Sequence, residues 1–346
     1  MNIKKSLIIT SIANDQHPVL HQFATACNVQ KIEFIVIGDT KSPETFSLQG
    51  CDFWSVERQL TLPFELAKIT PVRHYSRKNL GYLLAIQNGT EELMETDDDN
   101  IPKAAFWGTK KKETESYAIE NAGWVNVYHY FTKNKIWPRG FPLEELQNKQ
   151  SALSEQQKTI VNCPIQQGLA DENPDVDAIY RLTYPLPVNF EIKTKLALGK
   201  NAWSPFNSQN TYWFKEAFPL LYLPSYCSFR MTDIWRSYIA QRIAWECDWS
   251  ILYHEPTVTQ ERNDHNLMKD FEDEIPGYNN NFKICDALQK LELKQGKEHI
   301  ADNMITCYQK LIDIQVIGKE EMHLLKAWIS DITKLLQHQK ADKTTV

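Results

Sequence analysis

Short apolar runs alternate with amphipathic stretches over the first hundred residues. The apolar runs have the length of buried strands, and strands are predicted at residues 7–12, 34–37, 51–56 and 91–96. Apolar residues recur at helical spacing elsewhere, and helices are predicted at residues 17–27 and 76–88. Alternating strands and helices are typical of a mostly parallel sheet with helices on its faces. The sequence therefore predicts a Rossmann-like α/β fold.

The pattern changes in the rest of the chain. Residues 102–225 are rich in aromatic residues, Pro and Asn, and we expect irregular structure with some strands there. A helix is predicted at residues 232–244 and a strand at 249–253. Helical spacing then returns in charged sequence at residues 304–317 and 320–339.

Length and composition limit the domain count and the partners. The chain has 346 residues, of which 42% are apolar and 24% charged, and its formal net charge is −6. This size and apolar content predict one main domain over residues 1–278, whose second half begins near residue 103, and a C-terminal helical appendage over residues 279–346. The acidic balance argues against nucleic acid as a partner.

Targeting and redox signals are weak. No apolar stretch approaches the length of a membrane span, and the run after Lys5 is too short for a signal peptide. The seven cysteines are scattered without a Cys-x-x-Cys pair, so neither a zinc site nor a disulfide framework is predicted. We expect a cytoplasmic protein without a transmembrane segment, and we leave open a peripheral contact at the inner face of the membrane.

Three consecutive carboxylates, Asp97, Asp98 and Asp99, follow the strand predicted at residues 91–96. Adjacent carboxylates repel one another, so such a run is either solvated or neutralised by a cation. In an extended chain Asp97 and Asp99 share one face, and Asp98 points the other way. Two carboxylates on one face suit Mg²⁺ or Mn²⁺, and such a cation can bridge the phosphates of a nucleotide. The alternative is a solvated acidic turn before Pro102.

A basic segment begins the helix predicted at residues 76–88. Ser76 is a candidate N-cap, and the free N–H groups and dipole of a helix start favour an anion. We expect this segment to bind the diphosphate and ribose of a nucleotide through Arg73, Arg77, Lys78 and Asn79. The alternative is an ordinary solvated first turn.

Thr10 and Asp39 end the first two predicted strands. In open parallel sheets, ligands bind beyond the carboxyl ends of the strands. We therefore place Thr10 and Asp39, together with Asp97, on the nucleotide side of the site.

Five segments carry a resemblance to a known family. They are RKNLGYLLAIQNG at 77–89, ETDDDNIP at 95–102, GLADENPDVDA at 168–178, PFNSQNT at 205–211 and RMTDIWR at 230–236. With them, roughly residues 5 to 275 resemble the STELLO glycosyltransferase-like family. More distantly, the chain is similar to reversibly glycosylated polypeptides, the UDP-arabinopyranose mutases, which also carry three consecutive aspartates.

The resemblance implies a GT-A fold with the acidic triplet as its metal site. It implies a metal-dependent glycosyltransferase that uses a nucleoside-diphosphate sugar, with UDP as the expected nucleotide, and a glycan or lipid-linked carbohydrate as acceptor. Two alternatives stay open. One is a nucleotide-sugar mutase, which would need a transiently glycosylated arginine, and Arg139 is the nearest candidate by position. The other is a degenerate transferase that acts as a scaffold.

Two aspartates are candidates for catalysis. Asp233 begins the helix predicted at residues 232–244, and in the resemblance it belongs to the acceptor side, where a carboxylate could act as general base. A plain N-cap or an ion pair with Arg230 or Arg236 is the alternative. Asp98 is expected to turn toward the protein or the donor sugar.

His254 and His265 follow the strand predicted at residues 249–253. In the resemblance, this part of the chain often supplies a third metal ligand, and an imidazole would favour Mn²⁺ over Mg²⁺. A hydrogen-bonded loop histidine is the alternative for each.

Two further groups have weaker functional interpretations. A second acidic group could hold sugar hydroxyls or form a solvated loop; it comprises Asp171, Glu172, Asp175 and Asp177. Aromatic residues could stack on a sugar or pack in the core; they are Trp203, Tyr212 and Trp213.

Overall fold

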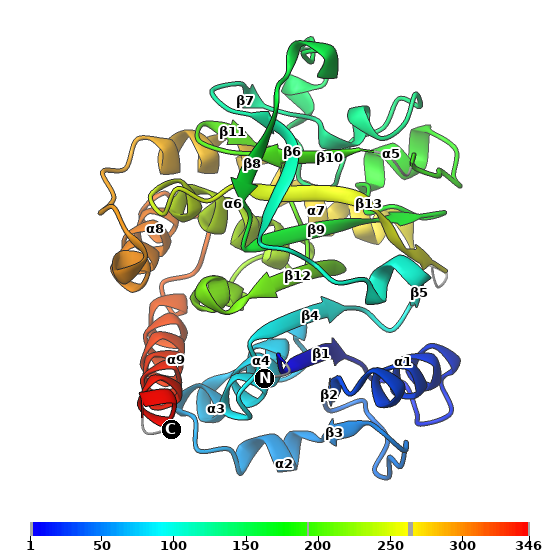
Figure 1. The fold of residues 1–346 in the computed structure, drawn as a ribbon, viewed down its shortest axis with the longest axis vertical. Coiled ribbons are helices and arrows are strands. Elements are labelled where there is room, and N and C mark those ends of the chain that lie inside the picture. Colours follow the sequence, from blue (N-terminus) through cyan, green and yellow to red (C-terminus); the bar gives the residue numbers. More distant parts are fainter. Residues whose placement is uncertain (1–2, 192–193, 262–265, 345–346) are drawn as a thin grey trace.

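One mixed sheet runs the length of the molecule, with helices packed around it (Figure 1). The computed structural model describes residues 3–191, 194–261 and 266–344, with side chains described up to residue 339. Within these ranges the sheet has 11 strands, and its main path runs β3-β2-β1-β4-β12-β9-β13-β10-β6-β8. A separate two-stranded sheet joins β7 (Gly123–Trp124) to β11 (Ala202–Trp203).

The N-terminal third forms the parallel part of the sheet. Its strands are β1 (Lys5–Thr10), β2 (Glu33–Ile37), β3 (Asp52–Trp54) and β4 (Glu92–Thr96). All three pairings among them are parallel, so their carboxyl ends meet at one edge. The predicted strands thus exist, and the α/β fold class is confirmed, with an arrangement consistent with the GT-A type.

Beyond β4 the sheet contains both antiparallel and parallel pairings, so the mostly parallel prediction holds best for the first four strands. The remaining strands are β5 (Asn100–Pro102), β6 (Glu113–Ile119), β8 (Lys158–Asn162), β9 (Ile165–Asp171), β10 (Lys195–Leu198), β12 (Asn210–Phe214) and β13 (Ile251–Gln260). β12 lies antiparallel between β4 and β9, while β13 is parallel to β9. This central group joins the two halves of the molecule.

The helices pack on both halves of the sheet. They are α1 (Pro18–Gln30), α2 (Val56–Leu60), α3 (Glu65–Ile69), α4 (Lys78–Gln87), α5 (Ala178–Thr183), α6 (Thr232–Trp245), α7 (Leu267–Gln289), α8 (Ile300–Asp313) and α9 (Glu321–Thr344). Short 3-10 turns are η1 (Tyr75–Arg77), η2 (Ala104–Trp107), η3 (Val127–Tyr130), η4 (Leu143–Glu145), η5 (Leu153–Glu155), η6 (Lys215–Leu221), η7 (Phe229–Met231) and η8 (Lys297–His299). No helix in the described part of the chain is long and apolar enough to cross a membrane.

Helix α4 lies unusually close to the parallel strands because of one glycine. A Cβ atom at Gly81 would lie 2.7 Å from Ile8 Cγ2 and 2.8 Å from Ile37 Cγ1. Any larger side chain would push α4 away from β1 and β2. This contact fixes the start of α4 beside the carboxyl ends of those strands.

The C-terminal helices belong to the same core as the parallel strands. Trp328 and Leu325 of α9 are buried in one apolar cluster with Leu80 and Leu83 of α4, and α9 crosses beside α3 and α4 (Figure 1). The boundary expected between residues 278 and 279 falls inside α7, a helix that the sequence pattern missed because Pro276 interrupts it. Helix α9 therefore packs against the N-terminal half and stabilises it.

We predict that Asp331→Ala lowers the free energy of unfolding by about 1–2 kcal/mol. The Asp331 carboxylate of α9 accepts hydrogen bonds from the backbone N–H groups of Glu65, at 3.1 Å, and Leu66, at 2.9 Å, at the start of α3. Urea denaturation measures the loss, and Asp302→Ala, at an exposed ion pair with Lys294, is the control. An Asp331 variant as stable as the control would show that this capping contact contributes nothing.

Candidate functional site

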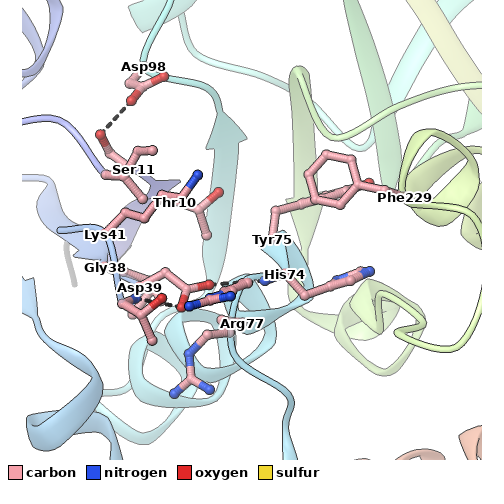
Figure 2. Close-up of a pocket in the computed structure, with 14 residues that line it drawn as sticks. Thr10, Ser11, Gly38, Asp39, Lys41, His74, Tyr75, Arg77, Asp98 and Phe229 are labelled. Atoms are coloured by element: carbon pink, nitrogen blue, oxygen red, sulfur yellow. Dashed lines mark hydrogen bonds between the residues drawn. The ribbon is translucent and has the colours of Figure 1, made fainter. Parts of the chain in front are cut away.

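A cavity of about 340 Å³ opens at the carboxyl ends of β1 and β2, next to the turn that follows β4 (Figure 2). Its lining comes from five parts of the chain, at residues 10–12, 37–41, 73–75 with 77, 98 and 229. Ligand cavities of enzymes commonly have this size and position. The predicted residues Thr10, Asp39 and Asp98 all border it.

The acidic triplet forms a turn and not an extended strand. β4 ends at Thr96, and the N–H of Asn100 donates to the carbonyl of Asp97 at 3.3 Å. The extended geometry from which a shared face of Asp97 and Asp99 was predicted is therefore absent, because the alternation of side chains stops at the turn. Each carboxylate has a different partner: Asp97 contacts Lys78, Asp98 accepts from the hydroxyl of Ser11, and Asp99 accepts from Gln260 Nε2 at 2.9 Å.

Lys78 is fully buried at the end of β4. Its ammonium donates to the carbonyl of Thr96 at 2.9 Å, to Asp97 Oδ1 at 3.0 Å and to the carbonyl of Ser208 at 3.4 Å. Lys78 therefore balances Asp97 from inside the protein and does not line the cavity.

Asp97 pairs with the buried Lys78 and keeps 39% of its side-chain surface exposed. Burial raises the pKa of this carboxyl to about 7; Lys78 opposes the shift, and the neighbouring charges of Asp99 and Asp98 add to it. The turn is thus a place where negative charge is concentrated and only partly compensated.

The basic segment divides between the cavity and the core. Arg73 is exposed at the cavity and holds a left-handed backbone conformation, with φ 59°. Arg77 borders the cavity, but its guanidinium turns into the core and donates to Gln59 Oε1 at 2.7 Å. The amide of Asn79 pairs with the backbone of Leu223 at 2.8 and 2.9 Å. The nucleotide assignments of Lys78 and Asn79 therefore need correction, because their polar groups are already bound within the protein.

Three aromatic side chains that the sequence reasoning did not assign stand beside the cavity (Figure 2). The rings of His74 and Tyr75 stack with centroids 5.9 Å apart, and Phe229 meets Tyr75 edge-on at 5.1 Å. Phe229 is 50% exposed. Phe229 directly precedes the family-like block RMTDIWR at 230–236. Its position beside the basic start of that block is the signal that could have identified it.

His74 is a neutral donor at the cavity wall. Its Nδ1 accepts from the N–H of Ser76 at 3.1 Å, so His74, and not Ser76, caps this turn. Burial lowers the pKa of the imidazole to about 4, with Asp39 opposing the shift. The proton of the neutral ring is therefore on Nε2, for which the described residues provide no hydrogen-bond partner.

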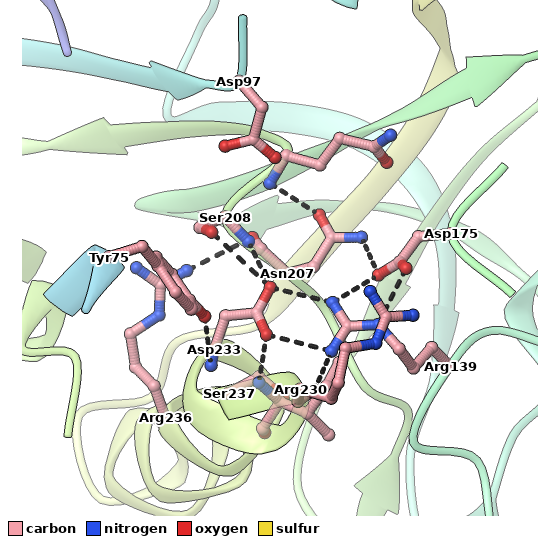
Figure 3. A network of polar contacts seen from close by, with 12 residues as sticks. Tyr75, Asp97, Arg139, Asp175, Asn207, Ser208, Arg230, Asp233, Arg236 and Ser237 are labelled. Atoms are coloured by element: carbon pink, nitrogen blue, oxygen red, sulfur yellow. Dashed lines mark hydrogen bonds and ion pairs between the residues drawn. The ribbon is translucent and has the colours of Figure 1, made fainter. Parts of the chain in front are cut away.

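Asp233 lies in a buried network behind the cavity (Figure 3). Arg139 forms two hydrogen bonds with Asp175, at 2.8 and 2.9 Å, and two with Asp233, at 3.2 and 3.1 Å. The N–H of Ser208 also donates to Asp233, and the N–H of Asp233 donates to Tyr75 Oη at 2.9 Å.

This network argues against the predicted role of Asp233 as a general base. Burial alone would raise its pKa, but the charge and hydrogen bonds of Arg139 outweigh burial and hold the pKa at about 2. A carboxylate that is fully bound and this acidic is a poor proton acceptor. Arg139 is occupied in the same way, so it does not offer the free arginine that the mutase alternative needs.

A second buried ion pair lies next to this network. Arg236 donates to both oxygens of Glu95, at 2.8 and 3.0 Å, and Glu95 also accepts from Trp213 Nε1 at 2.9 Å and from the hydroxyl of Tyr82. Both charged side chains are fully buried. The pair joins α6 to β4 directly before the acidic turn.

His254 is not part of the site. It lies six residues before Gln260 on β13, which separates it from the Asp99 end by about 20 Å at about 3.3 Å per residue. Burial lowers the pKa of His254 to about 3. The other histidine candidate, His265, lies outside the described residues. Among the residues that are described, no three His, Cys, Asp or Glu side chains group as metal ligands.

The remaining candidates have structural roles. Asp171 pairs with Lys103, Asp175 with Arg139, and Asp177 caps α5. The aromatic candidates Trp203, Tyr212 and Trp213 are buried in the core, and Glu172 pairs its backbone with Val188.

The comparisons with known proteins agree on one family. The model of the STELLO glycosyltransferases matches residues 230–341. The chain is 30% identical over 273 residues to probable glycosyltransferase STELLO2 of Arabidopsis thaliana, covering 72% of this chain and 35% of that protein. It is 31% identical over 248 residues to probable glycosyltransferase STELLO1 of the same plant, covering 65% and 32%.

The chain belongs to the STELLO family. It spans about a third of the length of these STELLO relatives. The family match runs from η7 through most of α9, so the C-terminal helices are part of the STELLO region and not an addition to it. A solved structure titled as a mycobacterial protein aligns over 83% of this chain and 73% of its own, with a TM-score of 0.41 and 10% identity.

Proposed function

We propose that this STELLO-family chain is a metal-dependent glycosyltransferase. It transfers a sugar from a nucleoside-diphosphate donor, expected to be a UDP-sugar, to a glycan or lipid-linked carbohydrate. The observation that carries this proposal is the cavity at the carboxyl ends of β1 and β2 with the acidic turn at its border. Family membership supports sugar transfer at the general level.

The cavity suits the nucleoside part of the donor. Asp39 accepts from the backbone N–H of His74 at 3.0 Å and borders the cavity. Its carboxylate offers an acceptor to a base or a ribose. Arg73 and Lys41 add positive charge at the same wall, which favours an anionic ligand.

The acidic turn fits a hard divalent cation. Asp98 borders the cavity, Asp99 follows Asp98 in the same turn, and Asp97 is balanced by Lys78. Mg²⁺ or Mn²⁺ is usually held by one or two carboxylates together with phosphate oxygens of the substrate. Asp98 and Asp99 would hold the cation, beside the third carboxylate of the turn, Asp97. A bound cation would neutralise the diphosphate as it leaves.

Calorimetry with UDP and Mn²⁺ tests the proposal. We expect UDP to bind with Mn²⁺ present and to bind at least about tenfold more weakly in Asp98→Asn, since a charge-assisted contact is lost. GDP and CMP in place of UDP report the base. Asp302→Asn, an exposed aspartate on α8, is the control. UDP binding that is equal with and without metal and unchanged in Asp98→Asn would overturn the proposal.

A further inference from the structure

A second groove lies over strands β6, β10 and β13, away from the nucleotide cavity. Its volume is about 690 Å³, and its walls come from β6, β10, β13 and the loop before β6. On β13 it is lined by Leu252, His254 and Glu255, at the amino end of the strand. Gln260, which contacts Asp99, is at the other end of β13. The two sites are therefore separate, and a ligand of the groove need not take part in the proposed transferase activity.

Lysine side chains gather in this groove. Lys110, Lys111 and Lys195 all line it. The ammonium of Lys110 donates to a neutral acceptor, the carbonyl of Ala105, at 3.1 Å, and the ion pairs within the described residues do not include it. Lys195 lies at the start of β10, where its ammonium is 3.5 Å from the hydroxyl of Thr114.

The charge of Lys110 is poorly compensated. Burial lowers the pKa of its ammonium; Glu255 opposes the shift, and the charges of Lys195 and Lys5 lower the pKa further. Lys5 itself pairs with Glu92 at 2.7 Å. A half-buried cation near other cations gains stability when an anion enters the same space.

The rest of the groove suits a carbohydrate. Glu113, Glu115 and Glu255 line it and can accept hydrogen bonds from sugar hydroxyls. Ile160 of β8, which is 74% exposed, gives it apolar surface, on which the C–H face of a sugar ring can pack. A small inorganic anion would use the lysines but leave these other groups without a role.

We propose that this groove binds a carbohydrate that carries an anionic group, a carboxylate or a phosphate, with Lys110 and Lys195 holding that group. The carboxylates of the groove bind the hydroxyls of the same ligand. The site stands apart from the donor cavity, so it can hold a segment of a longer acidic glycan while the cavity is occupied.

Calorimetry on the full chain at low salt tests the groove with four ligands. They are an oligogalacturonate trimer, its neutral galactose counterpart, glucose 6-phosphate and inorganic phosphate alone. We expect the trimer or glucose 6-phosphate to bind, the neutral sugar to bind at least about tenfold more weakly, and added salt to weaken binding. Which anionic sugar binds distinguishes a carboxylate site from a phosphate site.

Variants locate the binding. Lys110→Gln is expected to weaken it by about tenfold or more, and Lys110→Arg, which keeps the charge, to retain it. Lys195→Gln tests the second cation if Lys110→Gln does not fold. Lys200→Gln, at an exposed lysine just beyond β10, is the control and should bind as the natural chain does.

Three outcomes would overturn the proposal. The first is that neither anionic sugar binds. The second is that the neutral sugar or inorganic phosphate binds as tightly as the anionic sugars. The third is that Lys110→Gln and Lys195→Gln bind no differently from Lys200→Gln.

Discussion

Arg236→Leu is expected to lower the free energy of unfolding by about 3–5 kcal/mol, because it leaves a buried charge without its partner. The partner is Glu95, whose oxygens both accept from the guanidinium, at 2.8 and 3.0 Å. Glu95 would keep only the neutral donors Tyr82 and Trp213. Denaturation in urea, followed by tryptophan fluorescence, measures the loss.

The double variant Arg236→Leu/Glu95→Gln separates the charge from the packing. It removes both charges, so we expect it to recover a large part of the lost stability. Lys294→Met, which breaks an exposed pair with Asp302, should change stability by no more than about 1 kcal/mol. If the Arg236 single variant is no less stable than Lys294→Met, the buried pair does not stabilise the fold.

Asp233→Asn is expected to lower the free energy of unfolding by about 3 kcal/mol at neutral pH, because Arg139 loses one of its two carboxylate partners. The pKa of Asp233 falls from 3.8 to about 2 on folding. A depressed pKa stabilises the fold above pH about 4, and this stabilisation is lost as the pH falls toward 2. The stability difference between the natural chain and the variant should therefore shrink over that range.

Transfer kinetics distinguish this structural role from a catalytic one. If Asp233 were the general base, Asp233→Asn would reduce the transfer rate by about 10²–10⁴-fold and remove a step from the pH profile. We expect instead that the folded fraction of the variant keeps the shape of the natural pH profile. Asp175→Asn, on the other side of Arg139, is the matched variant and should behave in the same way.

Local pattern was sufficient for the parallel half of the fold. β1, β2, β4 and α4 have strong apolar runs or helical spacing, and strand ends in such a sheet meet at one edge. Thr10 and Asp39 could therefore be placed near one another from the sequence, whereas Asp98 borders the cavity where the sequence had placed Asp97. The sequence did not predict α7, because Pro276 is a local signal for a helix break. In the structure, the packing of the whole helix outweighs that signal.

Pairing between distant segments decided the rest of the site, and no local pattern shows it. Asp233 is paired by Arg139, 94 residues earlier in the chain. Lys78 looked like a phosphate ligand, but its ammonium is taken by Asp97 and by the carbonyl of Ser208, 130 residues away. His254 was expected just beyond a strand ending at residue 253, but β13 continues to Gln260, and it is that end which contacts Asp99 of the acidic turn.

The position of α9 has a consequence for synthesis of the chain. α3 and α4 leave the ribosome well before α9, since residues 88–320 lie between α4 and α9. Until then the surface that Trp328 and Leu325 later cover stays open to water, although N-terminal segments otherwise tend to fold first during translation. We therefore expect the nascent N-terminal half to complete its folding only after α9 has been translated. Until then, it should bind chaperones that recognise apolar surface.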